Sequence, residues 1–573
     1  MVKSLFFFSF LLFFFSCSLQ SRREQADIRD LFQRNQTVAA LELLEKSEIK
    51  KEKKNRLLYL LQKGKLLYAE KRFNRAGATF VQAGELMERL YTKSVSEMLL
   101  TGVSNNNSET YYGSVYERSL LFYYQALSFL NVYQRGKILE RKPAKEKAGK
   151  QDEFIEKKLS DQERKNFLFR ARASILAWDT FYKELQRSSR ESSFFNQDLF
   201  AKTLGAKIHE LVGSRGDEQI ALQLYKDALE ILYKSGPAFK NYNSQFEAYA
   251  KAFKGEDFGK KNKSELEKHI ENSKSFKGFE KFLKFKILSL AKKRRPGSLK
   301  AEMKRLNAPK DMVAKLDQRN NVTVLLESRL IAPLEGKTFS YNLRSAMEEI
   351  ENPAAKAFMA GVGLPVLTYF AMGPLGIGAV SSGGNSKLYV RHGAGELMTS
   401  EAGIEFEMPV IREPALASSY ELIAVQESNP KEAAKTELAL AGPISDLAYQ
   451  MNLERASNSY GKRGARIAIK HALAIIAAYK TYQAVQKTSG EVFAKPAAFA
   501  QYLMSAKAIK ESEKADTRQW SILPSEVFLG ELSLEPGVYQ FYIVDSNAPE
   551  KRISLGEALV AETGKEFFSY ILP

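Results

Sequence analysis

The residues that most often carry out chemistry are few in this chain and fall into no catalytic pattern. Its four histidines lie far apart, and no H-E-x-x-H metal motif or G-x-S-x-G nucleophile elbow occurs. They are His209, His269, His392 and His471. The glycine-rich string GAVSSGGNSK lacks the Gly-Lys-Ser/Thr with which a phosphate loop holds phosphates and magnesium. A carboxylate pair brought together only by folding would not show in the sequence, so that arrangement stays open. We therefore predict no cofactor, no metal ion and no enzymatic activity.

One residue does have a chemical context. Cys17 is the only cysteine among 573 residues, and it ends an apolar run that starts at Leu5, after the positive Lys3. Such a run has the length of a secretory signal and is too short to span a bilayer as a helix. The string FFSC resembles a bacterial lipoprotein signal and departs from it at Phe14, where leucine is usual. The resemblance implies that 1–16 are removed and that Cys17 carries lipid. The alternative is an ordinary cleaved signal, or a short anchor, with a chance cysteine nearby.

The charge of the chain points to an anionic partner. The formal net charge is +19, while the apolar fraction of 44% is ample for several hydrophobic cores. Such a field favours polyanions. An exported protein does not normally meet nucleic acid, so we expect anionic lipid or an acidic wall polymer instead. The alternative is that the excess of lysine only solvates helices.

Helical periodicity runs from 26 to about 306, and part of it repeats. In LLQKGKLLYAEKRFNRAGATFVQAGELME, small residues and one aromatic fall at the offsets of a tetratricopeptide repeat. They are Gly64, Ala76, Phe80 and Ala83. A second segment repeats the second-helix half at Ala221, Tyr225 and Ala228. We interpret 17–310 as an imperfect helical solenoid whose concave surface holds a protein partner. The alternative is a helical bundle in which these matches are coincidental.

The last part of this helical region is strongly basic. Residues 251–306 contain 18 lysines and arginines against 7 aspartates and glutamates. In FEKFLKFKILSLAKKRR, apolar residues share one helical face, which indicates the buried face of a final solenoid helix; adsorption to a membrane surface is the alternative. The four charges that follow cannot all be buried without partners, so we predict an exposed patch that contacts an anionic surface. They are Lys292, Lys293, Arg294 and Arg295.

Beyond residue 318 the pattern changes, and the fold class predicted for the whole chain is α+β. Alternating apolar residues indicate a β-rich region at 319–440. It contains an uncharged insert at 357–386, interpreted as a buried or re-entrant hairpin, with membrane insertion as the alternative. Helices return at 441–515. Between 467 and 484 the predicted helix has apolar residues on nearly all of its faces, which indicates central burial. Residues 516–573 indicate a small antiparallel β unit.

Several strings together resemble an uncharacterised family of bacterial envelope lipoproteins with N-terminal tetratricopeptide-like repeats. They are YERSLLFYYQALSFL, VTVLLESRLIAPLEGKTF, GARIAIKHAL and ADTRQWSILPSEVFLGELSLEPGVY. The sharpest motif contains Asp516, Arg518 and Trp520, and the sequence departs at Arg329-Leu330, where the resemblance leads us to expect a lone glycine. The family implies a class and a compartment but no reaction. Physically, an Asp–Arg pair beside an indole is expected to staple the helices to the terminal sheet.

These observations predict a lipid-anchored periplasmic scaffold that binds an envelope protein partner through its helices, in cell-envelope or cell-wall assembly. Ser18 follows the cysteine, instead of the aspartate that retains enteric lipoproteins at the inner membrane. We therefore expect the outer membrane, at its periplasmic face. Two alternatives remain: a membrane-active protein that inserts 357–386, and a cell-wall hydrolase.

Overall fold

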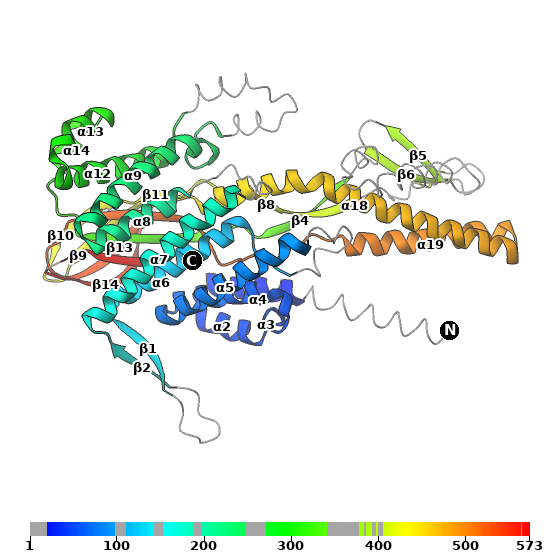
Figure 1. Ribbon diagram of the computed structural model, residues 1–573, viewed down its shortest axis with the longest axis horizontal. Coiled ribbons are helices and arrows are strands. Elements are labelled where there is room, and N and C mark those ends of the chain that lie inside the picture. The colour runs from blue at the N-terminus through cyan, green and yellow to red at the C-terminus, as the bar shows by residue number, and fades with distance from the viewer. Residues whose placement is uncertain are drawn as a thin grey trace.

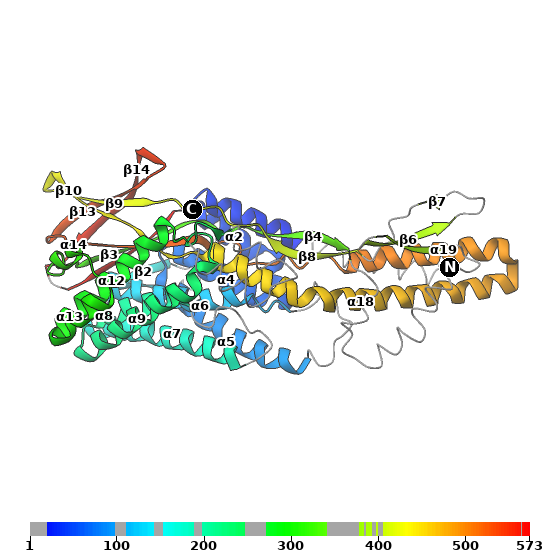
Figure 2. The ribbon, with the colours of Figure 1, turned by 90° about the horizontal axis from the view of Figure 1, so that it is seen from above.

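The computed structural model shows an elongated α+β molecule with a thick body at one end (Figure 1). It describes residues 20–97, 110–142, 153–187, 198–246, 271–340, 377–382, 385–391, 397–398, 405–562 and 564–572. Two long helices, α18 (Ile444–Ser489) and α19 (Glu491–Ser512), project from the body toward the other end (Figures 1 and 2). Cys17 lies outside the described residues.

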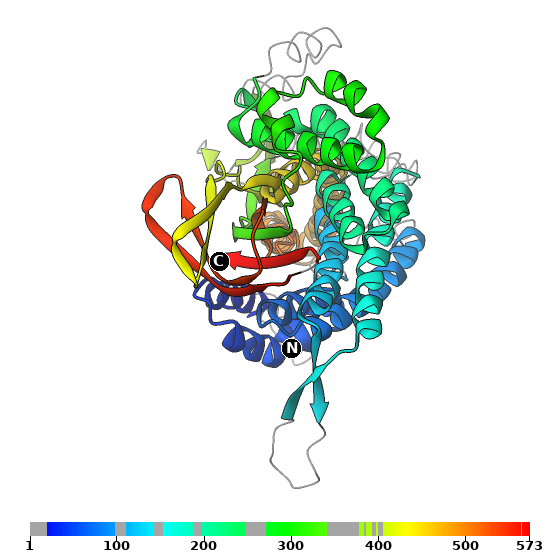
Figure 3. The ribbon, with the colours of Figure 1, turned by 90° about the vertical axis from the view of Figure 1, so that its left-hand side faces the viewer.

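The N-terminal half consists of helices that follow one another and pack against their neighbours. A helix over 20–33 comes first. The others are α2 (Thr37–Lys46), α3 (Glu48–Lys51), α4 (Arg56–Ala69), α5 (Phe73–Glu97), α6 (Val115–Arg135), α7 (Asp161–Arg187), α8 (Leu199–Val212), α9 (Arg215–Ser235), α12 (Lys274–Arg294), α13 (Leu299–Arg305) and α14 (Lys310–Ala314). Short 3-10 turns are η1 (Lys53–Asn55), η2 (Gly236–Ala238) and η3 (Pro296–Ser298). Figure 3 shows the helices as an arc that curves around one side of the larger sheets, with the ribbon of β1 (Lys137–Lys142) and β2 (Glu153–Lys158) projecting away from it.

Local sequence explains where these helices begin and how closely they pack. The carboxylate of Asp198 accepts the backbone N–H groups of Phe200 and Ala201, at 2.8 and 3.0 Å, and so caps α8. A Cβ atom at Gly64 would lie 2.6 Å from the ring of Phe80, so glycine is what lets α4 and α5 approach. This pair of helices is packed as the repeat pattern requires, but the structure does not show a regular array of repeats.

The apolar face of α12 is buried, as its sequence indicates. Phe279, Leu283 and Ile287 are fully buried, and the helix packs against α9 and β11 (Ala439–Gly442). The helical region is nevertheless not all-α. Between α6 and α7, β1 and β2 form an antiparallel ribbon.

The remaining strands that the structure describes form four sheets. They are β3 (Val322–Leu330), β4 (Leu334–Ser340), β5 (Ile377–Ser382), β6 (Asn385–Arg391), β7 (Leu397–Met398), β8 (Glu405–Ile411), β9 (Tyr420–Gln426), β10 (Asn429–Glu437), β12 (Pro524–Leu532), β13 (Gly537–Asp545), β14 (Ala548–Val560) and β15 (Glu566–Leu572), besides β11. Their orders are β11-β12-β3-β15, β10-β9-β13-β14, β4-β8 and β5-β6-β7.

The prediction that 516–573 form a β unit of their own is wrong. Its strands divide between two sheets and pair with strands of 319–440: β12 lies antiparallel to β3, and β13 lies antiparallel to β9. β15 runs parallel to β3. The reason lies in β3, which is buried on both faces along most of its length and therefore needs a neighbour at each edge.

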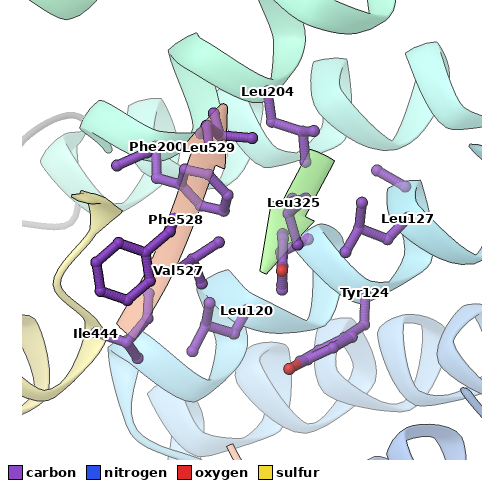
Figure 4. Packing of buried hydrophobic residues seen from close by; sticks show 14 of the residues in the cluster. Leu120, Tyr124, Leu127, Phe200, Leu204, Leu325, Ile444, Val527, Phe528 and Leu529 are labelled. Atoms are coloured by element: carbon purple, nitrogen blue, oxygen red, sulfur yellow. The ribbon is translucent and has the colours of Figure 1, made fainter. Parts of the chain in front are cut away.

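The main core lies between the helical arc and the sheet that contains β3. Side chains from α6, α8, β3, β12 and the first turn of α18 meet there (Figure 4). Those labelled are Leu120, Tyr124, Leu127, Phe200, Leu204, Leu325, Ile444, Val527, Phe528 and Leu529. The strands thus occupy the inner, concave side of the helices.

Central burial of 467–484 is also a wrong prediction. This stretch belongs to the projecting part of α18, where it packs chiefly against α19, and Leu473 is 51% exposed. A helix that is apolar on all faces needs neighbours on all of them to be buried. Among the described residues, α19 packs against one side of this stretch. Most of the insert at 357–386 lies outside the described residues; its described parts are β5 and the first two residues of β6, which pair antiparallel. Among the helices that the structure describes, none is long and apolar enough to cross a bilayer.

Candidate functional site

The inner side of the helical arc, predicted to receive a partner, holds residues 515–523 of the same chain. We name this stretch the junction segment; it connects α19 to β12. Its backbone is bound at both ends by the first helix. Arg22 donates to the carbonyl oxygen of Ala515, and Arg29 donates to that of Ser521 at 2.5 Å. The inner side of the arc, where we predicted a partner, is therefore occupied here by the chain itself.

Trp520 lies at the centre of the junction segment and is fully buried. Its ring centroid is 5.8 Å from that of Phe80 on α5 and 5.4 Å from that of Tyr124 on α6. The backbone N–H of Trp520 donates to Glu117 Oε1 at 2.5 Å. Burial raises the pKa of Glu117, although its carboxylate also accepts the Ser114 N–H. Phe80, which packs against Gly64 between α4 and α5, thus also packs against Trp520.

Asp516 and Arg518 form the planar pair that the sequence suggests. Arg518 Nε and Nη2 donate to the two carboxylate oxygens of Asp516, at 2.9 and 2.6 Å. Arg518 Nη1 also donates a hydrogen bond to Asn55 Oδ1 at 2.9 Å. This bond connects the pair to the turn before α4. The three motif residues therefore lie together at the boundary between helices and sheet, and each makes its contacts within the fold.

A buried ion pair joins α4 to the central strand β3. Lys65 Nζ contacts Glu327 and donates to Tyr124 OH at 2.8 Å, while Tyr123 OH donates to Glu327 Oε1 at 2.7 Å. Both charged side chains are 1% exposed. Burial lowers the pKa of Lys65 against the opposing attraction of Glu327. Four polar groups thus satisfy one another inside the core.

A larger buried cluster joins α8 and α12 to the same sheet. Lys286 Nζ lies 2.9 Å from both Glu210 and Glu531, and Lys207 Nζ lies 2.5 Å from Glu531. Lys565 adds a contact of 2.7 Å to Glu210. Burial alone would lower the pKa of Lys286, but the two carboxylates outweigh it and raise the pKa. Three lysines and two glutamates therefore bind the helices to β12 and to the start of β15.

Asp446 is a buried carboxyl group at the start of α18. Its Oδ2 accepts the backbone N–H and the side-chain amide of Asn241, at 2.9 and 3.0 Å. Its Oδ1 has no hydrogen-bond partner within the described part of the chain. Burial raises the pKa of Asp446 to about 7, against the effect of these donors. The root of the projecting helix thus contains a group that titrates near neutral pH.

The basic tract after the apolar face of α12 is paired more fully than its sequence suggests. The tract is Lys292, Lys293, Arg294 and Arg295. Lys292 Nζ lies 2.6 Å from Asp317 Oδ1, Lys293 Nζ lies 2.5 Å from Glu218 Oε1, and Arg294 also contacts Glu218. Lys293 and Arg295 are exposed, whereas Glu218 is buried. Much of the tract's charge therefore anchors α12 to α9, and contact with an anionic surface stays a prediction.

His209 is the one histidine whose side chain the described residues place. Its Nδ1 lies 2.7 Å from Asp217 Oδ1, and Arg172 lies 3.3 Å from the same oxygen. Ser214 Oγ contacts the other carboxylate oxygen, so the serine binds aspartate and not the imidazole. This arrangement caps α9 and has no nucleophile beside the base. Across the described residues, no group of three or more potential ligands could hold a metal ion.

No family model, no curated protein and no solved structure matches this chain. The site is therefore interpreted from its own geometry. Of the predicted residues, the structure brings Asp516, Arg518 and Trp520 together and leaves the basic tract elsewhere. Sequence reasoning missed Lys65 and Glu327; the one available signal was that Lys65 directly precedes the apolar pair Leu66-Leu67 and that Glu327 directly follows the apolar pair Leu325-Leu326.

Proposed function

We propose that this protein is a lipid-anchored, non-enzymatic scaffold at the periplasmic face of the outer membrane, where it holds an envelope protein partner. One observation carries the proposal. The junction segment and the two buried ion clusters fasten the helices to the strands on the inner side of the arc. Among the described residues, that inner side is occupied by the chain itself, while the outer side of the helices is left to contact other proteins. We place the partner on the outer side of the helices.

The outer face of α7 has the composition expected of such a contact. Phe169 and Leu176 lie two turns apart on it and are 50% and 57% exposed. Ala173 and Ala177, also exposed, continue the stripe between and beside them. The opposite face of α7 is buried through Trp178, so the exposed stripe is not required for the fold. Exposed apolar stripes bounded by polar residues mark sites of protein contact.

The anchor rests on Cys17, which we propose carries lipid as the first residue of the mature chain. The described chain begins three residues later, with a helix whose Arg22 contacts the junction segment. The N-terminal peptide, analysed by mass spectrometry, should begin at Cys17 and carry the mass of a diacylglyceryl group. An unmodified Cys17, or cleavage elsewhere, would remove the anchor from the proposal.

The partner is tested with the tagged, lipidated protein extracted from envelopes in mild detergent. Phe169→Asp with Leu176→Asp should dissociate a complex that the unchanged protein forms, as measured by its size on gel filtration. The matched control is Val38→Asp, since Val38 is 50% exposed on α2 and lies outside the stripe. A complex that survives the double change, or is lost equally in the control, contradicts the proposed face.

A further inference from the structure

The projecting helix α19 exposes an apolar stripe along three turns. Val492 and Phe493 lie in its first turn, beside the α18–α19 turn, and are 79% and 65% exposed. Leu503 and Met504 continue the same side and are 38% and 61% exposed. Pro496 and Ala500, between these pairs, are exposed as well. The spacing follows the helical repeat, so these side chains form one continuous surface, which we name the hairpin stripe.

The hairpin does not need this stripe to hold together. The opposite side of α19 places Ala494, Ala498 and Tyr502, all almost fully buried, against α18. Lys470 of α18 binds Glu513 at 2.6 Å, and Glu513 is tied through its carbonyl oxygen to the backbone of β8. The root is therefore fixed to the body. What remains exposed is an apolar face for which the described chain offers no cover.

The positive charge of the hairpin indicates which kind of partner can bind that exposed apolar face. α18 and α19 together contain ten lysines and arginines against four aspartates and glutamates, a formal excess of six positive charges. Exposed lysines stand near both ends of the stripe: Lys487 lies by the turn, and Lys507 lies one turn beyond Leu503. A second copy would bring two such positive hairpins together, which is unfavourable. A surface that is both apolar and negative fits, and an anionic bilayer has both properties.

The place where the α18–α19 hairpin joins the body, which we call the hairpin root, also favours a membrane as the occupant of the stripe. This step rests on the proposed function. Arg22 contacts Ala515, the first residue of the junction segment, directly after the hairpin. Residue 20 is three residues from Cys17, a distance of about 10 Å at most in extended chain. A lipid on Cys17 would therefore hold the hairpin root close to the bilayer surface. α19, about 33 Å long, then has the reach to lie along that surface.

We propose that α19 lies on the anionic leaflet, with the hairpin stripe in the boundary between headgroups and acyl chains and the flanking lysines at lipid phosphates. Val492 and Phe493 enter deepest, because they are the most exposed apolar residues of the stripe. The contact adds a second point of attachment to the proposed lipid on Cys17, so that the outer face of α7 is presented to the periplasm in one direction.

The test uses the mature chain, residues 17–573, with Cys17→Ser so that no lipid contributes. Flotation with vesicles of phosphatidylcholine and phosphatidylglycerol should show binding that is about tenfold stronger than with phosphatidylcholine alone. Combining Val492→Ser, Phe493→Ser and Met504→Ser should weaken that binding by about tenfold or more. The matched control combines Val38→Ser, Leu416→Ser and Leu559→Ser, three comparably exposed apolar residues elsewhere, and should bind like the unchanged chain.

A second measurement places the stripe directly. The sequence has two tryptophans, Trp178 and Trp520, and both are fully buried, so Phe493→Trp adds one exposed indole. Anionic vesicles should shift its emission to shorter wavelength and protect it from acrylamide. Equal flotation of the stripe variant and the unchanged chain, or an unshifted emission, overturns the proposal. Because no lipid on Cys17 is involved, these outcomes are separate from failure of the anchor, which the N-terminal mass reports.

Discussion

Removing one member of the Lys65–Glu327 pair should destabilise the body strongly. In Lys65→Met the carboxylate of Glu327 keeps the hydrogen bond from Tyr123 at 2.7 Å but loses its counter-ion in a site that is 1% exposed. An uncompensated buried charge of this kind costs about 3–5 kcal/mol of the free energy of unfolding at pH 7.

The measurement is urea unfolding followed by tryptophan fluorescence. Trp520 lies 5.4 Å from Tyr124, which binds Lys65, so the signal comes from the affected region. Lys65→Met with Glu327→Gln removes both charges and should recover to within about 1 kcal/mol of the unchanged protein. A cost of the single change below about 1 kcal/mol, or a double variant less stable than the single one, would refute the buried pair as described.

Three further predictions concern stability. Asp446, with a pKa of about 7 in the fold, favours the protonated form, so the unchanged protein should lose about 2–3 kcal/mol of stability between pH 5 and pH 8. Asp446→Asn should remove that pH dependence in thermal melts at both pH values. Gly64→Ala should cost about 1–3 kcal/mol, because its Cβ would meet Phe80, while Gly278→Ala, with open space on α12, should not destabilise. Trp520→Ala should cost about 3–5 kcal/mol by the same urea assay, with Trp178 as the reporter.

The sequence predicted local elements well where one face had to be buried. The spacing of Phe279, Leu283 and Ile287 placed the buried face of α12, and the small residue at Gly64 predicted a close helix pair. The alternation around Phe406 placed a strand at β8. These signals are local, since each depends on residues a few positions apart.

Long-range pairing could not be predicted in the same way. Lys65 and Glu327 are 262 positions apart, and each resembles a solvated charge until the fold places them together. The apolar stretch of α18 indicated burial, because composition does not tell cover by the body from cover by a membrane or partner. Arg329 replaces an expected glycine at φ 53°, a conformation that its hydrogen bonds to Glu526 help to hold. The sequence marked a departure from the expected glycine here, but it did not predict the left-handed backbone that Arg329 adopts.

The central claim, a lipid-anchored scaffold that binds a protein on the outer face of α7, is tested most directly by photocrosslinking in intact cells. A photoreactive phenylalanine analogue replaces Phe169 in one strain and Val38 in another, two positions with equal exposure. The account predicts one discrete adduct from position 169, which Leu176→Asp abolishes, and none from position 38. No adduct from position 169, or the same adducts from both positions, would contradict it.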